Sequence, residues 1–457
     1  MFCYLYRVFF SAIYMMYTEA YQFITSLNNV ARKEYLKTAK DCQIYLDRLQ
    51  LLLDLLGNPE KKIPHYIHVT GTSGKGSVCL MLGNILRASG KRTGILTSPS
   101  PDGLVGRTEI NGVPMSKPDF ARVVSTIKLA LERYVAIGTF DIPSPFEILT
   151  ALSLLYFAER SVSWAVVEVG LGGRYDSTNV IPYKDVAVIT NIGLDHAELI
   201  GPTKQDIAYE KAGIIKPGCT VFTGEKNAAI LNIIKQECRA SGSPLILANT
   251  FFETTTPKKP FTVTFTFDGT EYTLPTLGNH QIGNAALCTE IARSLGITNT
   301  AIRKGLATVI LPIRMEVVSK RPLIILDGAH NPDKMKTTVE TVRQLQATGY
   351  KLPAIHLIVG FSADKNITTM IKQLASLRPT SVACTRFTQN IFRKTMNPIE
   401  LAKLFKRAVP LSTVQAFLDP REALAWSKQR QKAGDGLLVT GSMYLSGELR
   451  STFKIRP

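Results

Sequence analysis

The residues best suited to chemistry are a lysine and a serine in a glycine-rich segment, GTSGKGS, at residues 71–77. A β-branched stretch at residues 66–69 precedes this segment, and the apolar pattern of residues 77–88 predicts a helix after it. Glycines let a backbone curl around phosphate groups, and the N–H groups at a helix N-terminus hold negative charge. The segment therefore predicts a phosphate site in which Lys75 reaches the outer phosphates. The alternative is a glycine-rich turn with a chance lysine.

The spacing of this segment differs from the G-x-x-x-x-G-K-[ST] pattern of phosphate loops. Residue 69 is valine, and Gly76 stands between Lys75 and Ser77. A kinase or GTPase loop is therefore not the best match, although the flanking strand and helix are those that a phosphate loop requires.

A carboxylate and an imidazole follow two further predicted strands. Glu168 lies within the apolar stretch of residues 164–169, where a carboxylate is costly unless it is paired or bound to a metal. An ion pair with Arg174 is one interpretation, and a metal ligand beside the phosphate segment is the one we favour. His196 follows the stretch of residues 186–191, at the strand end where ligands collect in open α/β sheets. A structural hydrogen bond is its alternative role.

Two weaker signals lie further along the chain. Lys211, in EKAGIIKPG, is by itself most simply a solvated lysine. In the second half, Asp327 and His330 belong to DGAHNP, which follows the apolar stretch of residues 323–326. This motif offers a carboxylate, an imidazole and an amide to a ligand that lies in a cleft.

The elements that must hold these groups alternate between strands and helices. This alternation predicts a parallel sheet in each half and two α/β lobes with a cleft between them. The alternation of strands and helices begins again near residue 311, where we place a domain boundary. Helices are predicted within residues 18–56 and at 77–88, 146–159, 280–295 and 332–348, strands at 66–69, 92–96, 164–169, 186–191, 323–326, 355–359, 381–384 and 436–440, and a hairpin at 261–275.

The composition is that of a globular protein of several domains. The 457 residues are too many for one ordinary core, and 45% are hydrophobic and 20% charged. The formal charge of +18 would attract anions, among them nucleic acids, nucleotides and polycarboxylates. Because there is no dense Lys/Arg tract interleaved with aromatic residues and no zinc-finger spacing, we do not expect a nucleic-acid partner.

The cysteines and the N-terminus indicate the cytoplasm. The chain has 7 cysteines and no C-x-x-C pair, which fits a reducing compartment. The apolar residues 1–16 are interrupted by Arg7 and lack a signal-peptide cleavage site. We interpret them as an N-terminal extension, with the natural start at Met15 or Met16, and expect no membrane association.

Taken together and in order, these segments resemble the folylpolyglutamate synthase/dihydrofolate synthase family within the Mur-ligase superfamily. The resemblance extends from about residue 17 to the end of the chain. Gly76 after the lysine resembles the folate branch, since other Mur ligases usually have threonine there. The motifs are HVTGTSGKGS (68–77), TSP (97–99), PFEILTAL (145–152), EVGLGGRYDSTN (168–179), GLDHAELIG (193–201), EKAGIIKPG (210–218), GNHQIGNAA (278–286), DGAHNP (327–332) and TGSMYLSGE (440–448).

The resemblance implies an α/β fold with two domains after the extension. Residues 17–310 would form the P-loop-containing, Mur-ligase-like domain that binds ATP on a mostly parallel sheet. Residues 311–457 would form a smaller, Rossmann-like glutamate-ligase domain. Two positions depart from the family pattern: Ser100 stands where many relatives have histidine, and Ser73 stands where they often have asparagine.

The resemblance also implies roles for individual residues. Lys211 resembles a lysine that CO₂ carbamoylates, which would make it a carboxylate able to bind a second Mg²⁺. Lys75, Glu168, His196 and Lys211 would be catalytic. The implied ligands are Gly74, Lys75, Gly76 and Ser77 for ATP phosphates; Ser98, Glu168, His196 and Lys211 for Mg²⁺; Asn284, Arg314, Asp327 and His330 for the nucleotide; and Ser144, Tyr175, Asp176 and Ser177 for the pterin-bearing substrate.

The expected activity is ATP-dependent ligation of L-glutamate to dihydropteroate, to tetrahydrofolate or to both, through an acyl phosphate. ADP and phosphate would be released, and we expect a monomer. One alternative is a Mur-type ligase that adds an amino acid to a cell-wall precursor. An alternative of another class is a P-loop nucleotide switch or nucleic-acid-binding protein, which would leave Glu168, His196 and DGAHNP unexplained.

Overall fold

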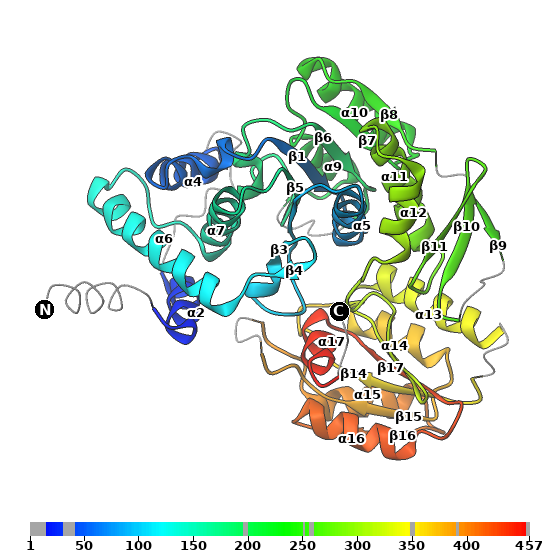
Figure 1. Cartoon of the computed structure of the whole chain (residues 1–457). Helices are drawn as coiled ribbons and strands as arrows, with labels where there is room; N and C mark the ends of the chain where they lie inside the picture. The colour runs from blue at the N-terminus through cyan, green and yellow to red at the C-terminus, as the bar shows by residue number, and fades with distance from the viewer. Residues whose placement is uncertain are drawn as a thin grey trace, which may run out of the picture. The chain divides into compact units, whose positions relative to one another are not determined.

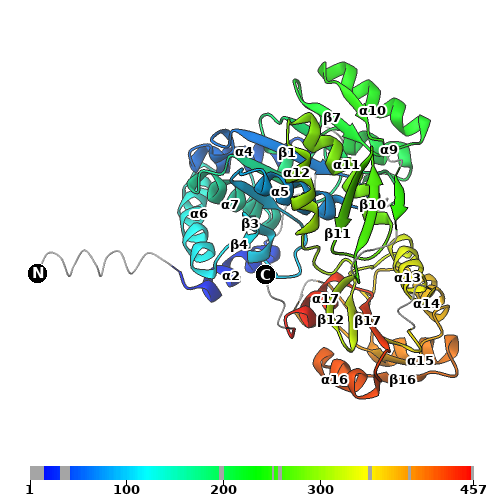
Figure 2. The same cartoon turned by 45° about the vertical axis from the view of Figure 1, so that its right-hand side comes forward.

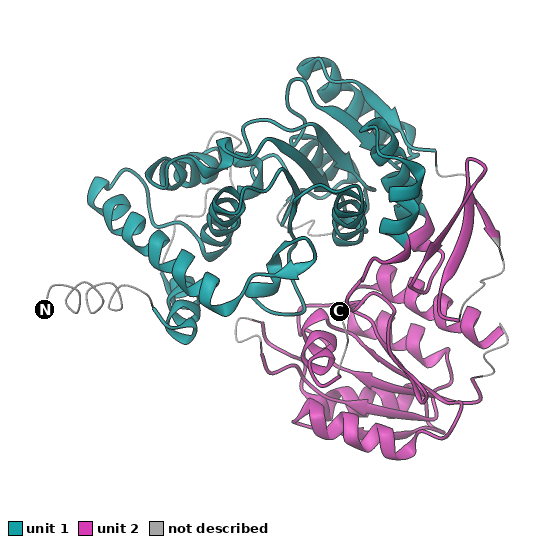
Figure 3. Ribbon diagram, in the orientation of Figure 1, with its two compact units in different colours: residues 1–251, 283–306 teal, residues 252–282, 307–457 magenta. Residues whose placement is uncertain are grey.

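The computed structural model describes residues 15–30, 42–194, 200–249, 252–255, 260–347, 352–389 and 393–453 (Figures 1 and 2). The chain forms two compact units, which Figure 3 shows in different colours. Unit 1 comprises residues 1–251 and 283–306, and unit 2 comprises residues 252–282 and 307–457. Residues 252–282 thus group with unit 2, although they precede residue 311.

Unit 1 is built on a mostly parallel sheet, as the sequence predicts. Its strands are β1 (His65–Thr70), β2 (Thr93–Leu96), β3 (Thr108–Ile110), β4 (Val113–Pro114), β5 (Trp164–Glu168), β6 (Val186–Ile189), β7 (Thr220–Thr223) and β8 (Leu245–Leu247). They lie in the order β4-β3-β2-β5-β1-β6-β7-β8. Neighbours pair in parallel except at β3, which runs antiparallel to β2 and to β4.

The central strands of this sheet end at the same edge. Strands β5 and β6 are fully buried, and all their residues except the terminal Glu168 are apolar, as expected where both faces of a parallel sheet are covered. In the register, Val69 of β1 lies opposite Glu168, and Leu96 of β2 lies opposite Val167. Groups that follow β2, β5, β1 and β6 therefore meet at one edge of the sheet.

Several helices of unit 1 start at polar caps that the sequence shows. The helix α6 was not predicted, although Ser116 caps it by accepting a hydrogen bond from the backbone of Asp119 and Pro118 occupies its first turn. The helices wholly or mostly in unit 1 are α2 (Tyr17–Ser26), α4 (Ile44–Leu55), α5 (Lys75–Ala88), α6 (Lys117–Ile137), α7 (Pro145–Glu159), α9 (Lys204–Ala212), α10 (Ala228–Ser241), α11 (His280–Ser294) and α12 (Asn299–Ala307).

Unit 2 contains a second, mostly parallel sheet. Its strands are β12 (Glu316–Lys320), β13 (Leu323–Leu326), β14 (Ile355–Val359), β15 (Ser381–Cys384), β16 (Thr413–Ala416) and β17 (Gly436–Thr440), in the order β12-β13-β17-β14-β15-β16. Only β12 pairs antiparallel within this sheet. The accompanying helices are α13 (Pro332–Ala347), α14 (Ile367–Ala375), α15 (Pro398–Ala408), α16 (Pro420–Arg430) and α17 (Met443–Arg450).

The predicted hairpin is confirmed in unit 2. A small antiparallel sheet holds β9 (Glu253–Thr255), β10 (Val263–Phe267) and β11 (Thr270–Leu274) in the order β11-β10-β9. The turn between β10 and β11 is Asp268-Gly269, and both residues have positive φ, at 47° and 68°. Positive φ at both positions is what a tight two-residue hairpin turn requires.

No helix within the described ranges is long and apolar enough to cross a bilayer.

The strand predicted at residues 186–191 ends earlier than expected. Strand β6 stops at Ile189, before Thr190 and Asn191. Both of these residues turn their polar groups toward the glycine-rich segment of residues 71–77 instead of continuing the sheet. The strand ends early because Thr190 and Asn191 contact the glycine-rich segment.

Candidate active site

The glycine-rich segment forms a tight loop between β1 and α5. Gly74 caps the helix with φ of 85°, and Lys75 is the first helical residue. Gly71 has φ of 145°, and a β-carbon built there would lie 1.8 Å from Oγ1 of Thr190, so only glycine fits. The ammonium group of Lys75 donates a hydrogen bond of 2.9 Å to the carbonyl oxygen of Gly71. The side chain of Lys75 therefore lies across the loop whose phosphate it is predicted to bind.

The end of β6 braces this loop. The backbone N–H of Thr72 donates to the carbonyl oxygen of Asn191 over 2.9 Å, and that of Ser73 donates to Oδ1 of Asn191 over 2.8 Å. The hydroxyl of Thr190 donates to the carbonyl oxygen of Ser73 over 2.6 Å. Asn191 was not predicted from the sequence as a loop-bracing residue, because the contact depends on β1 and β6 being neighbours.

The helix α11 contributes a predicted nucleotide residue to the same loop. A β-carbon built on Gly74 would lie 2.6 Å from Oδ1 of Asn284. Both residues belong to unit 1, and Asn284 is half-buried. The amide of Asn284 therefore lies directly against the glycine-rich loop of residues 71–77, which we call the phosphate loop after its predicted role.

Two predicted metal ligands lie side by side at the edge of the sheet. The backbone N–H of Ser98, just after β2, donates to Oε2 of Glu168 at the end of β5 over 3.0 Å. Glu168 is only 5% exposed. Carboxylate and hydroxyl oxygens are the protein donors that Mg²⁺ prefers. The pair Ser98 and Glu168 therefore fits a magnesium ion next to the phosphate loop.

Arg107 is a residue of this site that was not predicted from the sequence. Its Nη2 donates a hydrogen bond of 2.6 Å to Oγ of Ser98, and its guanidinium carbon lies 5.3 Å from the centre of the Phe146 ring. It reaches Ser98 because β3 pairs with β2, with Thr108 opposite Leu96. A guanidinium here adds positive charge beside the groups that would hold anionic substrates.

The alternative partner for Glu168 is engaged elsewhere. Arg174 donates from Nη2 to Oε1 of Glu237 over 2.7 Å, and its guanidinium carbon lies 4.0 Å above the ring of Tyr209. Arg174, which the sequence offered as an ion-pair partner for Glu168, therefore pairs with Glu237 instead. The metal-ligand role remains the prediction for Glu168.

Lys211 lies in the last turn of α9 and is only 5% exposed, which contradicts the default of a solvated lysine. The loop after Glu168 packs against its backbone: a β-carbon on Gly173 would lie 2.9 Å from the carbonyl oxygen of Glu210 and 3.0 Å from that of Lys211. Only glycine allows this approach. The end of α9 is thereby held against the loop that begins at Glu168.

His196 lies outside the described residues, so its position is not part of this geometry. Within the described ranges, no group of three or more histidine, cysteine, aspartate or glutamate side chains is placed to hold a metal ion. The predicted set joins His196 to a serine, a single glutamate and a modified lysine, and it stays a prediction.

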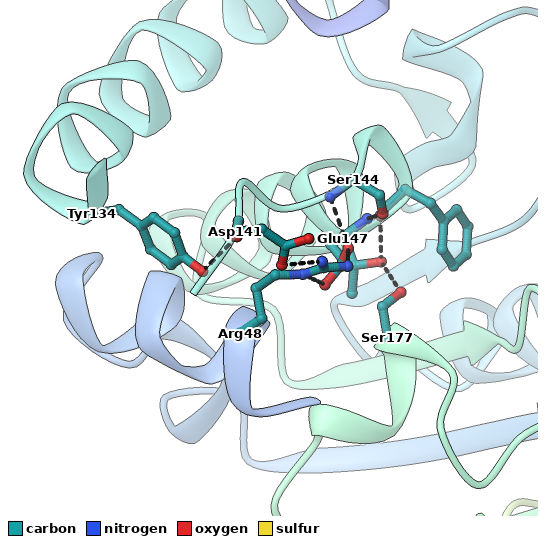
Figure 4. Close-up of polar contacts among 8 residues, drawn as sticks. Arg48, Tyr134, Asp141, Ser144, Glu147 and Ser177 are labelled. Atoms are coloured by element: carbon teal, nitrogen blue, oxygen red, sulfur yellow. Dashed lines mark hydrogen bonds and ion pairs between the residues drawn. The ribbon is translucent and has the colours of Figure 1, made fainter. Parts of the chain in front are cut away.

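The predicted substrate residues lie at the N-cap of α7 and where the preceding loop enters the short 3₁₀ helix η4 (Ser177–Val180), whose first residue is Ser177. Ser144 caps α7, accepting from the backbone N–H of Glu147 over 3.3 Å. The hydroxyls of Ser177 and Thr150 lie 3.0 Å apart, which joins the loop to α7 (Figure 4). Tyr175 is half-buried, and burial raises the pKa of its hydroxyl.

A buried ionic cluster fixes the start of α7. Figure 4 shows Arg48 of α4 between Asp141 and Glu147. The guanidinium donates to both carboxylate oxygens of Glu147, over 2.8 and 2.6 Å, and to Asp141 over 2.7 Å. Glu147 Oε2 in turn accepts from the backbone N–H of Ser144 over 2.7 Å. The cluster therefore orients the N-terminus of α7, where Ser144 and Phe146 lie.

The remaining predicted nucleotide residues belong to unit 2. Asp327 is buried, and its carboxylate accepts from the backbone N–H groups of Met315 and Ala329, each over 3.0 Å. His330 lies 2.8 Å through Nδ1 from the carbonyl oxygen of Gly328. Arg314 donates from Nη1 to the carbonyl oxygen of Pro312 over 3.0 Å. The contacts of Asp327 and His330 hold the DGAHNP turn in shape, and the nucleotide roles of all three residues stay predictions.

Two family models match most of the chain. Residues 69–292 match the Mur ligase middle domain, and residues 313–443 match the Mur ligase glutamate ligase domain. The chain is 33% identical to the dihydrofolate synthase/folylpolyglutamate synthase of Bacillus subtilis, over 90% of this chain and 95% of that protein. It is 32% identical to the folylpolyglutamate synthase of Lacticaseibacillus casei, over 96% and 99% of the two chains.

A solved structure shares the whole architecture. The folylpolyglutamate synthase of Mycobacterium tuberculosis complexed with ADP superposes with a TM-score of 0.82 at 27% identity, covering 96% of this chain and 99% of that one. The likeness confirms the predicted α/β fold with its two mostly parallel sheets. By its motifs, its fold and these similarities, the chain belongs to the dihydrofolate synthase/folylpolyglutamate synthase family of Mur ligases.

Proposed function

We propose that this protein is an ATP-dependent ligase that joins L-glutamate to the carboxylate of a folate-type acceptor. The observation that carries the proposal is the meeting of Ser98, Glu168 and the phosphate loop at the carboxyl edge of one sheet. Relatives with similarity along nearly the whole chain are named dihydrofolate synthase/folylpolyglutamate synthase and folylpolyglutamate synthase. The acceptor is accordingly dihydropteroate, tetrahydrofolate or both.

The chemistry has to overcome the poor reactivity of a carboxylate. The acceptor carboxylate attacks the γ-phosphate of ATP, which yields an acyl phosphate and ADP. The amine of glutamate then attacks the acyl carbon, and the tetrahedral adduct collapses to the amide and phosphate. In this proposal Lys75, at the start of α5, and the N–H groups of that helix end stabilise the charge that builds on the phosphate oxygens. Each well-placed group of this kind lowers the barrier by about 3–4 kcal/mol.

Ser98, Glu168, His196 and Lys211 would hold magnesium. Bound Mg²⁺ neutralises the charge of phosphate oxygens and orients them for transfer. Carbamoylation of Lys211 needs an uncharged amine, for which a buried lysine is suited, and would add a carboxylate for a second ion. ¹³C NMR of the intact protein kept with ¹³C-bicarbonate tests this modification through the resonance of the carbamate carbon. Lys211→Arg is the control, and a wild-type spectrum without a carbamate resonance beyond that of Lys211→Arg contradicts it.

The other predicted residues keep the roles that the family resemblance implies. Asn284 supports the assignment, because it lies against Gly74 of the phosphate loop. The two proposed groups are Asn284, Arg314, Asp327 and His330 for the nucleotide, and Ser144, Tyr175, Asp176 and Ser177 for the pterin-bearing substrate.

One assay tests the proposed function. Purified protein is supplied with ATP, Mg²⁺ and labelled glutamate, with dihydropteroate or tetrahydrofolate as acceptor. We expect label in a glutamylated folate, together with release of ADP. Parallel reactions contain a UDP-sugar peptide as acceptor, or DNA or RNA without glutamate. Transfer only to the peptide, or ATP turnover that depends only on nucleic acid, would overturn the proposal.

We further propose that the protein acts as a cytoplasmic monomer. In this proposal residues 17–310 serve as the ATP-binding catalytic domain, residues 311–457 as the glutamate-ligase domain, and residues 1–16 as an extension. Light scattering of the purified protein with ATP and Mg²⁺ tests the oligomeric state, and a stable dimer would contradict it. Limited proteolysis that cuts far from residue 311 would contradict the proposed boundary.

A further inference from the structure

A row of buried polar side chains runs beneath the loop of residues 170–178 in unit 1. Nζ of Lys184 lies 2.8 Å from Nδ1 of His68, and Nε2 of His68 lies 2.8 Å from Oγ1 of Thr178. The hydroxyl of Thr178 donates to Oδ1 of Asp176. The four side chains are exposed by no more than 7%. Lys184, His68 and Thr178 have no place in the site that the sequence predicts.

The direction of these hydrogen bonds is fixed by the carboxylate at one end. Asp176 accepts from the backbone N–H of Leu171 over 2.9 Å and from that of Thr178 over 3.0 Å. The single hydroxyl hydrogen of Thr178 is used on Asp176, so its oxygen can only accept from His68. Nε2 of His68 therefore carries the hydrogen, and Nδ1 accepts from Lys184. One tautomer of His68 satisfies the whole row.

The lysine at the other end has uncharged partners. Besides His68, Lys184 donates to Oδ1 of Asn179 over 3.1 Å. Nζ of Lys216 donates to the carbonyl oxygen of Asn179 over 2.8 Å. Burial and the nearby Lys216 lower the pKa of Lys184 well below its ordinary value. An amine placed so deeply without a carboxylate costs stability, which indicates that its donor role is used.

The loop that this row supports carries proposed folate residues. It contains Tyr175 and Ser177, and it begins just after Glu168. A second contact from β1 holds it, since the hydroxyl of Thr70 donates to the carbonyl oxygen of Gly172 over 2.8 Å. The phosphate loop, by contrast, is braced by Thr190 and by Asn191 at the end of β6. The two loops are thus held by different contacts.

We propose that Lys184 and His68 are positioning residues which, through Thr178 and Asp176, hold the loop of residues 170–178 in the conformation that accepts the folate substrate. The inference rests on the proposed function for the identity of that substrate. Neither residue needs to touch the substrate, because both act through the orientation of Asp176. Their loss should therefore weaken folate binding more than nucleotide binding.

The test removes or keeps the hydroxyl of Thr178, which joins His68 to Asp176. Thr178→Val removes the hydroxyl at nearly constant volume, and Thr178→Ser keeps it. We expect Thr178→Val to raise KM for the folate acceptor at least about tenfold, in proportion to a lost hydrogen bond to a charged group. KM for ATP should stay within about twofold, and Thr178→Ser should recover most of the loss. Lys184→Met should act in the same direction as Thr178→Val.

The control is Thr289→Val in α11. Its buried hydroxyl donates only within its own helix, over 2.8 Å to the carbonyl oxygen of Ala285. This variant measures the effect of losing a buried hydroxyl elsewhere in unit 1, and we expect both KM values to stay near those of the wild type. Melting temperatures of all variants separate changes in stability from changes in binding.

The outcomes are distinct. An unchanged folate KM in Thr178→Val, an equal rise in both KM values, or no recovery in Thr178→Ser overturns the positioning role. If Lys184→Met does not fold, the two variants of Thr178 still decide. A wild-type protein that forms no glutamylated folate overturns the proposed function itself and this inference with it. If the wild-type protein does form the product, the KM values of the variants alone decide the positioning role.

Discussion

The amide oxygen of Asn284 lies where the first atom of any side chain at position 74 would have to go. A β-carbon on Gly74 would be 2.6 Å from Oδ1 of Asn284, well inside the contact distance of the two atoms. Gly74 also has φ of 85°, which disfavours other residues. The backbone conformation therefore favours glycine at the N-terminus of α5, and any other residue there would displace the amide of Asn284.

The first prediction separates these two requirements. Gly74→Ala should abolish detectable ADP binding in calorimetry, because Asn284 must move and the loop must distort. The matched control is Gly90→Ala, since Gly90 has φ of 86° but nothing lies within 4 Å of its built β-carbon. Both variants should lose about 1 kcal/mol of stability from backbone strain, but only Gly74→Ala should lose the nucleotide. Equal ADP affinity in the two variants would contradict this explanation.

The second prediction concerns the carboxylate at the end of β5. Glu168→Gln keeps the shape of the side chain and removes its charge, so we expect a fall in kcat of about 10²–10³ at saturating Mg²⁺. The protein should stay folded, as judged by its melting temperature. Glu159→Gln is the control, because Glu159 lies at the far end of α7 and pairs with the partly exposed Arg122. A Glu168→Gln enzyme that retains kcat within about tenfold would speak against the metal role.

The third prediction compares a buried and an exposed ion pair. Burial opposes the charge of Arg48, but hydrogen bonds and attraction from Glu147 and Asp141 outweigh it and raise the pKa of the guanidinium above its usual range. Arg48→Leu leaves two carboxylates without their cation, so urea unfolding should show a loss of about 3–5 kcal/mol. Arg122→Leu breaks a partly exposed pair with Glu159 and should cost about 0–1 kcal/mol. Similar losses in both variants would be the contrary result.

The fourth prediction is a dependence of stability on pH. Burial lowers the pKa of Lys216 from its ordinary value of 10.5 to about 8. Between these values the unfolded chain holds a proton that the folded chain lacks, so the free energy of unfolding rises with pH across this window. Below about pH 8 both states are protonated, and the full cost of the buried charge remains.

The variant Lys216→Met removes this contribution. The wild-type free energy of unfolding minus that of Lys216→Met should increase by on the order of 2 kcal/mol between about pH 7.5 and pH 10. Lys216 also lowers the pKa of the nearby Lys184, so the variant removes both effects, and both make the difference rise with pH. Urea unfolding at several pH values gives the measurement. A difference that stays flat, or that falls as pH rises, would count against a depressed pKa in the folded state.

Sequence patterns predicted most of the sheets and the glycine-rich turns. Apolar runs such as residues 164–168 stand out because both faces of a parallel strand are buried, and Asp268-Gly269 marks its hairpin because both residues can adopt positive φ. The pairing of Ser98 with Glu168 was also accessible, through the family motifs, since groups at adjacent strand ends must meet.

Other parts of the site depend on which strands are neighbours. Asn191 reaches the phosphate loop because β6 lies beside β1, and Arg107 reaches Ser98 because β3 pairs with β2. Nothing local in the chain indicates either contact. The row from Lys184 to Asp176 is equally invisible, because His68 looks like one more residue of a buried strand. Tertiary register, and not local propensity, assigns these side chains their partners.

The contact between Gly74 and Asn284 has a consequence for how the protein is made. The phosphate loop is synthesised early, whereas the helix α11 that covers it leaves the ribosome only after most of unit 1 has been translated. A nascent chain that stops before α11 contains all the strands of the unit 1 sheet but lacks the amide that lies against the loop. Competence to hold nucleotide would accordingly arise late in translation, when the fold is nearly assembled.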